Sequence, residues 1–320
     1  MPLHRVYDVV IESSVSLPEL PLVETGHAGC RFRVTTACRQ TRTPRAWSHH
    51  WRLPDGTIWT SFARLKTRHL IRFPELADFL ISTDGTQVEC RILRQTPEST
   101  IRHLFLDQVL PLILSRQGKL VLHASAVVGQ DGAIAFAGVS GMGKSTLSTS
   151  FCQQGYSLLA DDGLLLEEDQ RGLLAIPGYP GVRLWEDMAS ALFGNACKRS
   201  PVAHYTEKMR VGADAIQLPF CSEPVLVRRI YLLSEPSSNG AGDAIAIHPL
   251  AAQEGFMELV RHTYRLDLLD KEKLRDEFVR LSRVIAVPLF RRLEFPRKLE
   301  LLPEVRAAIL RDLAGSRDGG

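Results

Sequence analysis

Apolar and polar residues alternate in short runs over the first third of the chain, and turn-forming pairs separate these runs. Asp55-Gly56 and Asp84-Gly85 are two such turns, and WRLPDGTIWTSF, which contains the first, is the clearest hairpin. Alternation with a period of two places every second side chain on one face of a strand. Residues 1–98 are therefore predicted to form a small, mostly antiparallel, β-rich domain.

After this region the apolar residues change to the period of a helix. In TPESTIRHLFLDQVLPLILSRQG, residues 96–118, they recur every three or four positions between a Ser/Thr-containing start and Gly118. Pro111 lies inside this segment and lacks a backbone N–H group, so we expect the helix to end or to kink there.

From Lys119 the chain is a series of short apolar strands with few helices. KLVLHASAVV and AIAFAG are predicted to form a hairpin across the turn GQDG, and LLLEEDQRGLLAI to form a second one. Between them, KSTLSTSFCQQG is predicted to be a helix that ends at Gly155, and YSLLADD a strand. LPEVRAAILRDLAG has the spacing of an amphipathic helix, and the final SRDGG is expected to be a frayed tail. Residues 99–320 are thus predicted to be an α/β domain with a mixed sheet, leaning towards the α+β class and unlike a repeated βαβ fold.

Composition narrows the possible functions. The 320 residues are 45% hydrophobic and 23% charged, which is typical of a folded globular protein. The net charge of +3 falls short of the concentrated positive field of a nucleic-acid-binding protein. No run approaches 18 apolar residues, and MPLHRVYDVV lacks the pattern of a secretory signal. We expect a cytoplasmic protein with no nucleic-acid or membrane partner, and leave open whether it is a homo-oligomer.

The cysteines are scattered, with no CxxC pair and no Cys/His spacing typical of a metal site. We expect reduced and mostly buried thiols. The six residues are Cys30, Cys38, Cys90, Cys152, Cys197 and Cys221.

The segment AFAGVSGMGKSTLS contains the spacing Gly-x4-Gly-Lys-Ser, after an apolar strand and at the start of a helix. Backbone N–H groups and a helix N-terminus at such a place surround a phosphate, and Gly138, Gly141 and Gly143 allow its close approach. Lys144 is predicted to neutralise charge on the β- and γ-phosphates, and the Ser145 hydroxyl to coordinate Mg²⁺. The alternative is an ordinary glycine-rich turn before a helix. The predicted nucleotide-binding residues are Gly138, Ser140, Gly141, Met142, Gly143, Lys144, Ser145 and Thr146.

Two other classes of phosphate-loop protein lack their signatures here. A GTPase ordinarily carries Asn-Lys-x-Asp, yet Asn195 and Asn239 are followed by Ala-Cys and Gly-Ala. No LSGGQ-like stretch indicates a transporter ATPase.

Two neighbouring aspartates, Asp161 and Asp162, end the apolar strand of LLADD. Neighbouring side chains of a regular strand point to opposite faces, so the chain must turn for both to serve one site, and Gly163 favours a turn. One carboxylate can then hold Mg²⁺ while the other faces a nucleophile; the alternative is a solvated acidic turn. His123, between apolar residues in LHASAV, is by itself more typical of a core histidine.

The segment LHASAVVGQDGAIAFAGVSGMGKSTLSTSFCQQGYSLLADD resembles the catalytic core of the HPr kinase/phosphorylase family. That family has a strand histidine, a hairpin, a phosphate loop, a short helix ending in glycine and an Ala-Asp-Asp strand in the same order. The match is specific over about 40 residues and loose over residues 119–300. It implies a phosphate-loop kinase core with the fold shared by phosphoenolpyruvate carboxykinase, and ATP and Mg²⁺ as cofactors.

The resemblance also implies a role for each matched residue. Asp161 matches the general base that acts on a serine hydroxyl, and His123 matches its histidine partner. Asp162 and Ser145 match the magnesium side, and Lys144 the phosphate side. The predicted catalytic residues are thus Asp161, His123 and Lys144.

Two departures argue against HPr as the substrate and against phosphorylase activity. Thr146 stands where bifunctional members have Glu, and PGYPGVRLWEDM replaces an EVRGLGI-like signature. LPELP, ADFLISTDG, PGYPGVRLW and VPLFRRLEFPR make the whole chain resemble the HPr-kinase-related proteins of bacterial gene clusters for ribosomal peptides, including lasso peptides. That resemblance implies a serine of a precursor peptide as the acceptor.

The sequence therefore predicts an ATP- and Mg²⁺-dependent serine kinase that acts on a peptide or small protein. Residues 1–98 would recognise the substrate, and residues 99–320 would catalyse the transfer. Arg183, Lys208 and Arg210 are candidate contacts to phosphate or to an acidic substrate end, or else solvated surface charges. The alternatives are a kinase of free serine or another small alcohol, an HPr kinase/phosphorylase, and a nucleotide-binding regulatory module that transfers no phosphate.

Overall fold

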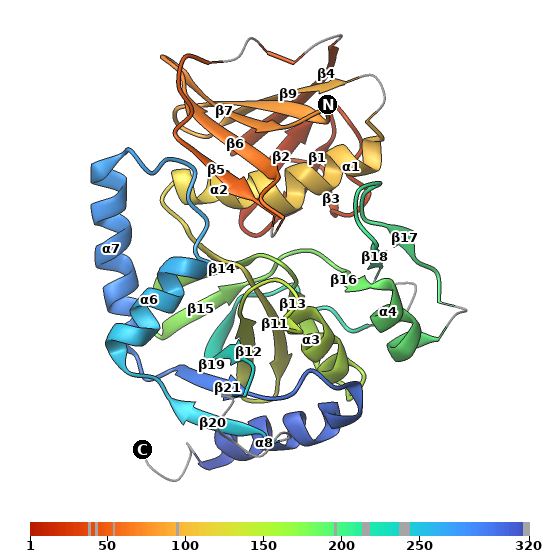
Figure 1. The fold of residues 1–320 in the computed structure, drawn as a ribbon, viewed down its shortest axis with the longest axis vertical. Coiled ribbons are helices and arrows are strands. Elements are labelled where there is room, and N and C mark those ends of the chain that lie inside the picture. Colours follow the sequence, from red (N-terminus) through yellow and green to blue (C-terminus); the bar gives the residue numbers. More distant parts are fainter. Residues whose placement is uncertain are drawn as a thin grey trace. The chain divides into compact units, whose positions relative to one another are not determined.

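The chain divides into two compact units in the computed structural model, which is shown in Figure 1. The structure describes residues 1–37, 40–41, 44–53, 55–93, 96–194, 197–212, 218–236 and 244–315. The expected tail and the residues Cys38, Asn195 and Asn239 lie outside these ranges. The first unit comprises Met1–Leu120, Pro201–Glu207 and Tyr264–Glu277, and the second comprises Val121–Ser200, Lys208–Thr263 and Phe278–Gly320.

The first unit is built on one sheet, whose described strands follow the order β3-β1-β2-β4-β9-β8-β7-β6-β5. The predicted hairpins at Asp55-Gly56 and Asp84-Gly85 are confirmed as β5–β6 and β8–β9. Most pairs are antiparallel, but β4 runs parallel to both β2 and β9. The strands are β1 (Leu3–Val6), β2 (Val9–Ser13), β3 (Leu22–Val23), β4 (Cys30–Ala37), β5 (His49–Arg52), β6 (Ile58–Arg64), β7 (Arg68–Phe73), β8 (Ala77–Ser82) and β9 (Gln87–Leu93).

The helix predicted within residues 96–118 is present and continues through Pro111. It runs as α1 (Glu98–His103), a π-helical segment η1 (Leu104–Val109) and α2 (Leu110–Arg116). The Leu110 N–H group bonds the Phe105 carbonyl, five residues back, so a π-helical turn directly precedes Pro111, which lies at the start of α2. The predicted Ser/Thr start does not cap the helix, because Pro97 is the N-cap residue.

The first unit extends to Leu120 and not only to residue 98, where the sequence predicts a boundary. The reason is the burial of this helical segment against the sheet. Phe105 stacks on Phe32 of β4 with 3.7 Å between the ring centroids, and both rings are fully buried. The helix therefore completes the core of the first unit.

The second unit is a mixed sheet covered by helices. Its described strands follow the order β10-β14-β15-β19-β12-β11-β13, with β21 beside β19 and β20 beside β21. The two predicted hairpins are confirmed as β11–β12 and β14–β15, while β19 runs parallel to β12 and β21. The strands are β10 (Leu120–Leu122), β11 (Ala124–Gly129), β12 (Gly132–Ala137), β13 (Ser157–Ala160), β14 (Leu164–Asp169), β15 (Gly172–Ile176), β19 (Val225–Ser234), β20 (Ala246–Pro249) and β21 (Phe290–Glu294).

The remaining elements complete the chain, which is a mixed α/β protein. β16 (Val182–Trp185) pairs with β18 (Lys208–Val211). In β17 (Ser200–Pro201), Ser200 belongs to the second unit and Pro201 to the first. The predicted helices that end at Gly155 and that contain LPEVRAAILRDLAG are confirmed as α3 and α8. The helices are α3 (Lys144–Cys152), α4 (Glu186–Phe193), α6 (Ala252–His262), α7 (Lys271–Ala286), the 3₁₀ turn η2 (Leu299–Leu301) and α8 (Leu302–Gly315).

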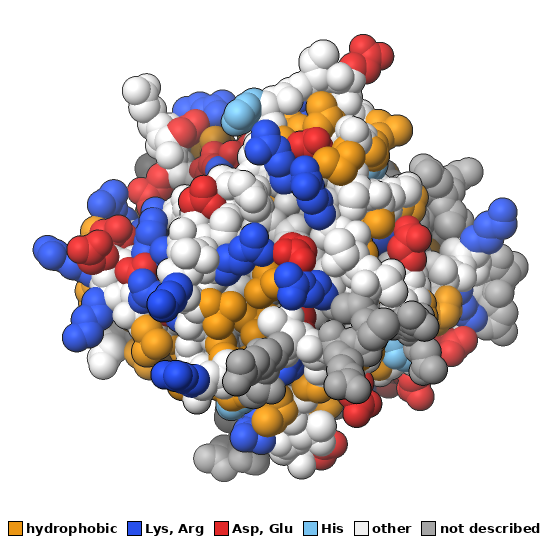
Figure 2. Space-filling view, turned by 90° about the horizontal axis from the view of Figure 1, so that it is seen from above, with side chains coloured by type: hydrophobic (Ala, Val, Ile, Leu, Met, Phe, Trp, Pro, Cys, Tyr) orange, Lys and Arg blue, Asp and Glu red, His pale blue; other side chains and the backbone are white. Residues whose placement is uncertain are grey.

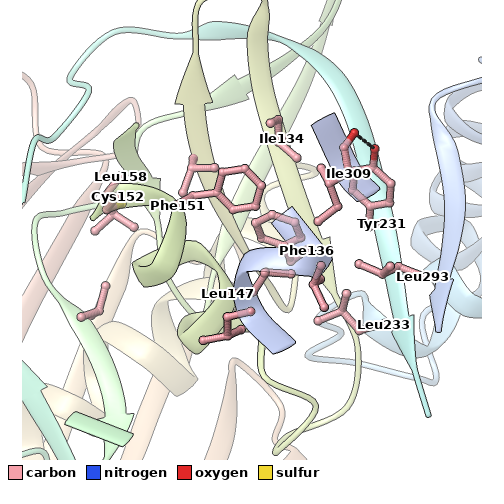
Figure 3. Close-up of a cluster of buried hydrophobic side chains, with 14 of the residues drawn as sticks. Ile134, Phe136, Leu147, Phe151, Cys152, Leu158, Tyr231, Leu233, Leu293 and Ile309 are labelled. Atoms are coloured by element: carbon pink, nitrogen blue, oxygen red, sulfur yellow. Dashed lines mark hydrogen bonds between the residues drawn. The ribbon is translucent and has the colours of Figure 1, made fainter. Parts of the chain in front are cut away.

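The core of the second unit lies between its sheet and the helices α3 and α8, as Figure 3 shows. Phe136 of β12 is at its centre, stacked against Phe151 of α3 and Tyr231 of β19 with ring centroids 5.7 and 6.2 Å away. The Tyr231 hydroxyl donates to Asp312 of α8 at 2.7 Å, so the polar end of this ring is satisfied. This core fixes the strand end and the helix start that flank the glycine-rich loop.

Three features of the described residues are their surface charge, their cysteines and the character of their helices. On the face that Figure 2 shows, Lys and Arg side chains are interspersed with Asp and Glu. All five cysteines in the described part of the chain are free, and Cys30, Cys90 and Cys152 are buried. Within the same part, no helix combines the length and the apolar character needed to cross a membrane.

Phe136→Ala is expected to lower the free energy of unfolding by about 3–5 kcal/mol, because it leaves a cavity in a fully packed core. Urea denaturation measures this change. Phe278→Ala is the matched control: that ring is 58% exposed, so the same truncation should cost less than about 1 kcal/mol. Equal losses in the two variants would show that Phe136 is not a centre of the core.

Candidate functional site

Three segments that are distant in the sequence meet at one edge of the mixed sheet of the second unit. β11 lies between β12 and β13 and is antiparallel to both, so its start lies beside their ends, as the pairing of Ala124 with Ala137 shows. Residues 138–143, the glycine-rich loop, follow β12, and residues 161–162 follow β13. His123 immediately precedes β11. The sheet therefore brings the predicted loop, the paired aspartates and the histidine together.

The glycine-rich loop has the backbone that its glycines allow. Gly141 and Gly143 have φ values of +86° and +89°, which residues with a side chain rarely adopt, and Gly143 is the N-cap of α3. A Cβ atom on Gly138 would lie 3.3 Å from the Leu233 carbonyl oxygen. The loop thus turns sharply and directs the first N–H groups of α3 towards its hollow side, where an anion is favoured.

Lys144 is buried at the start of α3, and its ammonium group reaches back to the first residues of the glycine-rich loop. Its Nζ atom donates to the carbonyl oxygens of Gly138 at 2.8 Å and Val139 at 3.2 Å. Burial lowers the pKa of this amine to about 8, although Asp162 opposes the shift. The charged amine has therefore lost hydration inside the loop, and the attraction of a bound anion would offset that loss.

The carboxylate of Asp161 is completely buried and hydrogen bonded through both oxygens. Its Oδ1 accepts from Ser125 at 2.5 Å and from Ser145 at 2.7 Å, and its Oδ2 accepts from the backbone N–H group of Arg183 at 2.8 Å. Burial and the neighbouring Asp162 charge raise the pKa of this carboxyl group, while the Arg183 guanidinium and the two hydroxyls oppose the rise. Asp161 therefore ties β11, α3 and β16 together.

Asp162 lies at the turn after β13 and lines a cavity. Its φ of +63° is left-handed, so the predicted turn is made by Asp162 itself. Its side chain is 12% exposed, and the Nε atom of Arg183 is 3.9 Å from its Oδ2. Arg183 is itself buried, donates to the Asp161 carbonyl oxygen and to the Tyr179 hydroxyl, and lies over the Tyr179 ring.

His123 is neutral near physiological pH. Burial, followed by the nearby Lys144 charge, lowers its pKa to about 4. Its Nδ1 atom is 3.0 Å from the Asp162 carbonyl oxygen, which can only accept, so Nδ1 carries the proton. The ring therefore holds the backbone of the aspartate turn.

The loop and the turn open into a cavity of about 520 Å³. One part of its wall is charged, with five Lys or Arg and two Asp side chains; another part is apolar. The charged residues are Lys144, Asp162, Arg183, Asp187, Lys208, Arg297 and Lys298. The apolar residues are Leu184, Trp185, Met188, Phe295, Leu299 and Leu302.

Most of the predicted site residues lie at this cavity. Two of the predicted catalytic residues do not line it: Asp161 is buried among its hydrogen-bond donors, and His123 bonds the Asp162 carbonyl oxygen. Gly138, at the strand end, and Met142, whose side chain packs in the hydrophobic core, do not line it either. Arg210 is also absent from the wall and lies over the Tyr179 ring, 6.0 Å from its centroid. Lys208 lines the cavity beside Trp185. The functional roles of all these residues remain predictions.

Sequence reasoning missed Ser125 and the apolar wall. Ser125 was detectable, because it lies two residues after His123 and a strand places such residues on one face. Trp185 and Phe295 come from segments that are distant from the loop in sequence, and no local pattern connects them to it. Arg297, which donates to the Gly141 carbonyl oxygen at 3.1 Å, was likewise hidden in a basic stretch.

The residues present fit a nucleotide with Mg²⁺. No three His, Cys, Asp or Glu side chains that the structure describes are grouped to bind a metal by themselves. Mg²⁺ ordinarily takes one or two protein oxygens and completes its shell with phosphate oxygens and water. Ser145 and the aspartate pair supply such oxygens, beside a loop that suits a phosphate.

No family model and no curated protein matches this chain. Among solved structures, the Hpr(Ser) kinase/phosphatase from Coxiella burnetii aligns with 51% of this chain and 96% of its own, at 15% sequence identity and a TM-score of 0.26. Similarity at this level is too distant to assign a function, which must come from the site itself.

Lys144→Met is expected to stabilise the ligand-free protein and to weaken nucleotide binding at least 100-fold. The depressed pKa corresponds to about 3 kcal/mol of destabilisation, and the loss of two hydrogen bonds leaves a net gain of about 1 kcal/mol at pH 7. The pKa of Lys144 in the folded protein lies below the ordinary lysine pKa of 10.5, so the gain should persist below pH 8 and shrink between pH 8 and 10.5. Thermal unfolding without nucleotide measures stability, and calorimetric titration measures affinity. Lys198→Met, which changes an exposed lysine outside the cavity, is the control. Lower stability of the Lys144→Met protein than of the wild type would contradict this explanation.

Proposed function

We propose that this chain is a phosphotransferase that moves the γ-phosphoryl group of a nucleoside triphosphate, ATP, to an alcohol. The observation that carries the proposal is the cavity lined by a glycine-rich loop, a buried lysine and Asp162, with the buried Asp161 carboxylate bonded to Ser145 of its wall. A site for phosphate alone would need only the loop and the lysine. The aspartate turn beside them is what favours chemistry on the bound phosphate over binding alone.

The two kinds of wall in the cavity support a nucleotide as the ligand. The loop and Lys144 suit the phosphates, while Trp185 and Leu299 offer an apolar surface to a flat base. A volume of about 520 Å³ lies in the ordinary range of a small-molecule site. Five cationic side chains favour a ligand with several negative charges.

In this proposal each group has a part in the transfer. The N–H groups of the loop and the ammonium of Lys144 hold the β- and γ-phosphates and balance the charge that develops between them. Mg²⁺, when bound, would neutralise phosphate charge next to Ser145 and the aspartates. One aspartate of the pair accepts the proton of the acceptor hydroxyl. Arg183 fixes the spacing of the two carboxylates because it lies within 4 Å of both.

The proposed acceptor is a serine hydroxyl of a peptide or small protein. Its support is the resemblance of the whole chain to the HPr-kinase-related proteins of ribosomal-peptide gene clusters, through LPELP, ADFLISTDG, PGYPGVRLW and VPLFRRLEFPR. We further propose that the N-terminal β-rich region recognises the peptide.

Intact-mass spectrometry with MgATP tests the proposal. The candidate acceptors are serine-containing peptides encoded near the gene, free serine and HPr, each with wild-type protein and with Lys144→Met. We expect one added phosphate on the peptide with the wild type and at least a 100-fold lower rate with the variant. Transfer to free serine or HPr instead would identify one of the alternative kinases. Nucleotide binding without transfer to any acceptor would indicate a regulatory module.

Trp185→Ala is expected to weaken ATP binding about 10-fold through the loss of base stacking, which is worth about 1–3 kcal/mol per base. It should leave the affinity for inorganic triphosphate unchanged, because that ligand has no base. Competition titrations with the two ligands measure the difference. Trp59→Ala, which changes a tryptophan of the first unit, is the control. Equal weakening for ATP and triphosphate would place the base elsewhere.

A further inference from the structure

The geometry points to Arg297 as a residue that binds the phosphate chain of the nucleotide, and to Glu235 as a carboxylate that competes with the nucleotide for it. This inference rests on the proposed function and adds a phosphate contact that lies outside the glycine-rich loop and the aspartate turn. It follows from where three strands of the second unit end and from the partners of the Arg297 guanidinium.

Three parallel strands end at the edge of the sheet where the glycine-rich loop lies. β19 runs parallel to both β12 and β21, and the three strands lie side by side in Figure 1. The glycine-rich loop follows β12, Glu235 follows β19, and residues 295–298 follow β21. In open α/β sheets, ligands bind beyond the carboxyl ends of the parallel strands. Glu235 and Arg297 therefore lie at the edge where a ligand of the loop is expected.

The segment after β21 is fixed against the glycine-rich loop. Phe295 is 3% exposed, and its backbone N–H group donates to the Ser234 carbonyl oxygen at 3.3 Å. A Cβ atom on Gly143 would lie 3.9 Å from the Phe295 ring. Two residues later, the Nη1 atom of Arg297 donates to the Gly141 carbonyl oxygen at 3.1 Å. The buried ring thus anchors the backbone, and the guanidinium reaches the loop.

The Arg297 guanidinium connects the cavity with a carboxylate outside it. Its Nη2 atom is 2.7 Å from the Oε1 atom of Glu235. Arg297 lines the cavity, whereas Glu235 does not. The two side chains are 52% and 58% exposed, so water screens their attraction and the pair is weak. Arg183, another cation of the wall, is instead 2% exposed and lies within 4 Å of both aspartates.

A phosphate chain is a stronger partner for this guanidinium than Glu235. It offers several charged oxygens, and the planar guanidinium can bond two of them at once. Rotation of the Arg297 side chain exchanges one partner for the other while the backbone at Phe295 stays anchored. Removal of the guanidinium should therefore weaken phosphate binding, and removal of the competing Glu235 charge should strengthen it.

Calorimetric titrations with MgATP and with inorganic triphosphate test the inference. Arg297→Gln should weaken the binding of both ligands by the same factor, about 10- to 100-fold, because the lost contact is to phosphate and not to the base. Glu235→Gln should strengthen the binding of both about threefold. Arg171→Gln is the control, because Arg171 is an exposed arginine that pairs with Asp169 outside the cavity, and it should change neither affinity.

The double variant separates competition for Arg297 from simple repulsion of the ligand by Glu235. In the Arg297→Gln protein, the further change Glu235→Gln should alter either affinity less than about 1.5-fold, because no guanidinium is left to compete for. Repulsion alone would give the same gain in both backgrounds.

Unchanged triphosphate affinity in Arg297→Gln would overturn the inference. Weaker binding in Glu235→Gln would also overturn it, because that is the result of a purely structural tie between Glu235, Arg297 and the loop. An equal gain in both backgrounds would refute the competition. These titrations measure binding alone, so a wild-type protein that binds ATP but transfers no phosphate would refute the proposed transfer while the Arg297 result stands. A wild-type protein that binds neither ligand would refute both.

Discussion

The buried carboxylate of Asp161 is the interaction on which the rest of the site depends. It accepts hydrogen bonds from three segments, through Ser125 in β11, Ser145 in α3 and the Arg183 backbone in β16. A buried charge is tolerated only when donors surround it, so none of these segments can shift without leaving the carboxylate unsatisfied. The position of the glycine-rich loop relative to the aspartate turn is set in this way.

Several features of the site are unfavourable in the ligand-free protein, and a bound anion would relieve the first of them, the buried charge of Lys144. Lys144 is held with a depressed pKa, and the raised pKa of the Asp161 carboxyl group shows that burial and the second aspartate oppose its charge. Asp162 adopts a left-handed backbone. Groups that are costly to hold and that converge on one cavity are typical of functional sites, where stability is lower than the scaffold would allow. The packed core around Phe136 supplies that scaffold.

The two aspartates show why a motif does not assign chemistry by itself. Asp161 and Asp162 are chemically identical and adjacent, so the sequence distinguishes them only through a resemblance. The fold makes them different, because one carboxylate points into a network of donors and the other into a cavity. Arg183, which lies within 4 Å of both, couples their charges.

Local patterns in the sequence determined the elements and the chemical identity of the loop. The hairpins at Asp55-Gly56 and Asp84-Gly85, the helix that starts at Lys144 and the mixed character of the second sheet all follow from short-range rules, because turns, periodicity and glycine torsions act within a few residues. Only the tertiary structure decided which residues meet. It attached the helix of residues 98–116 to the first unit through Phe105 and continued it through Pro111 after a π-helical segment. It also brought Ser125 to Asp161, and Trp185 and Phe295 to the cavity. Strand register and core packing join segments far apart in the chain, and no local pattern records such partners.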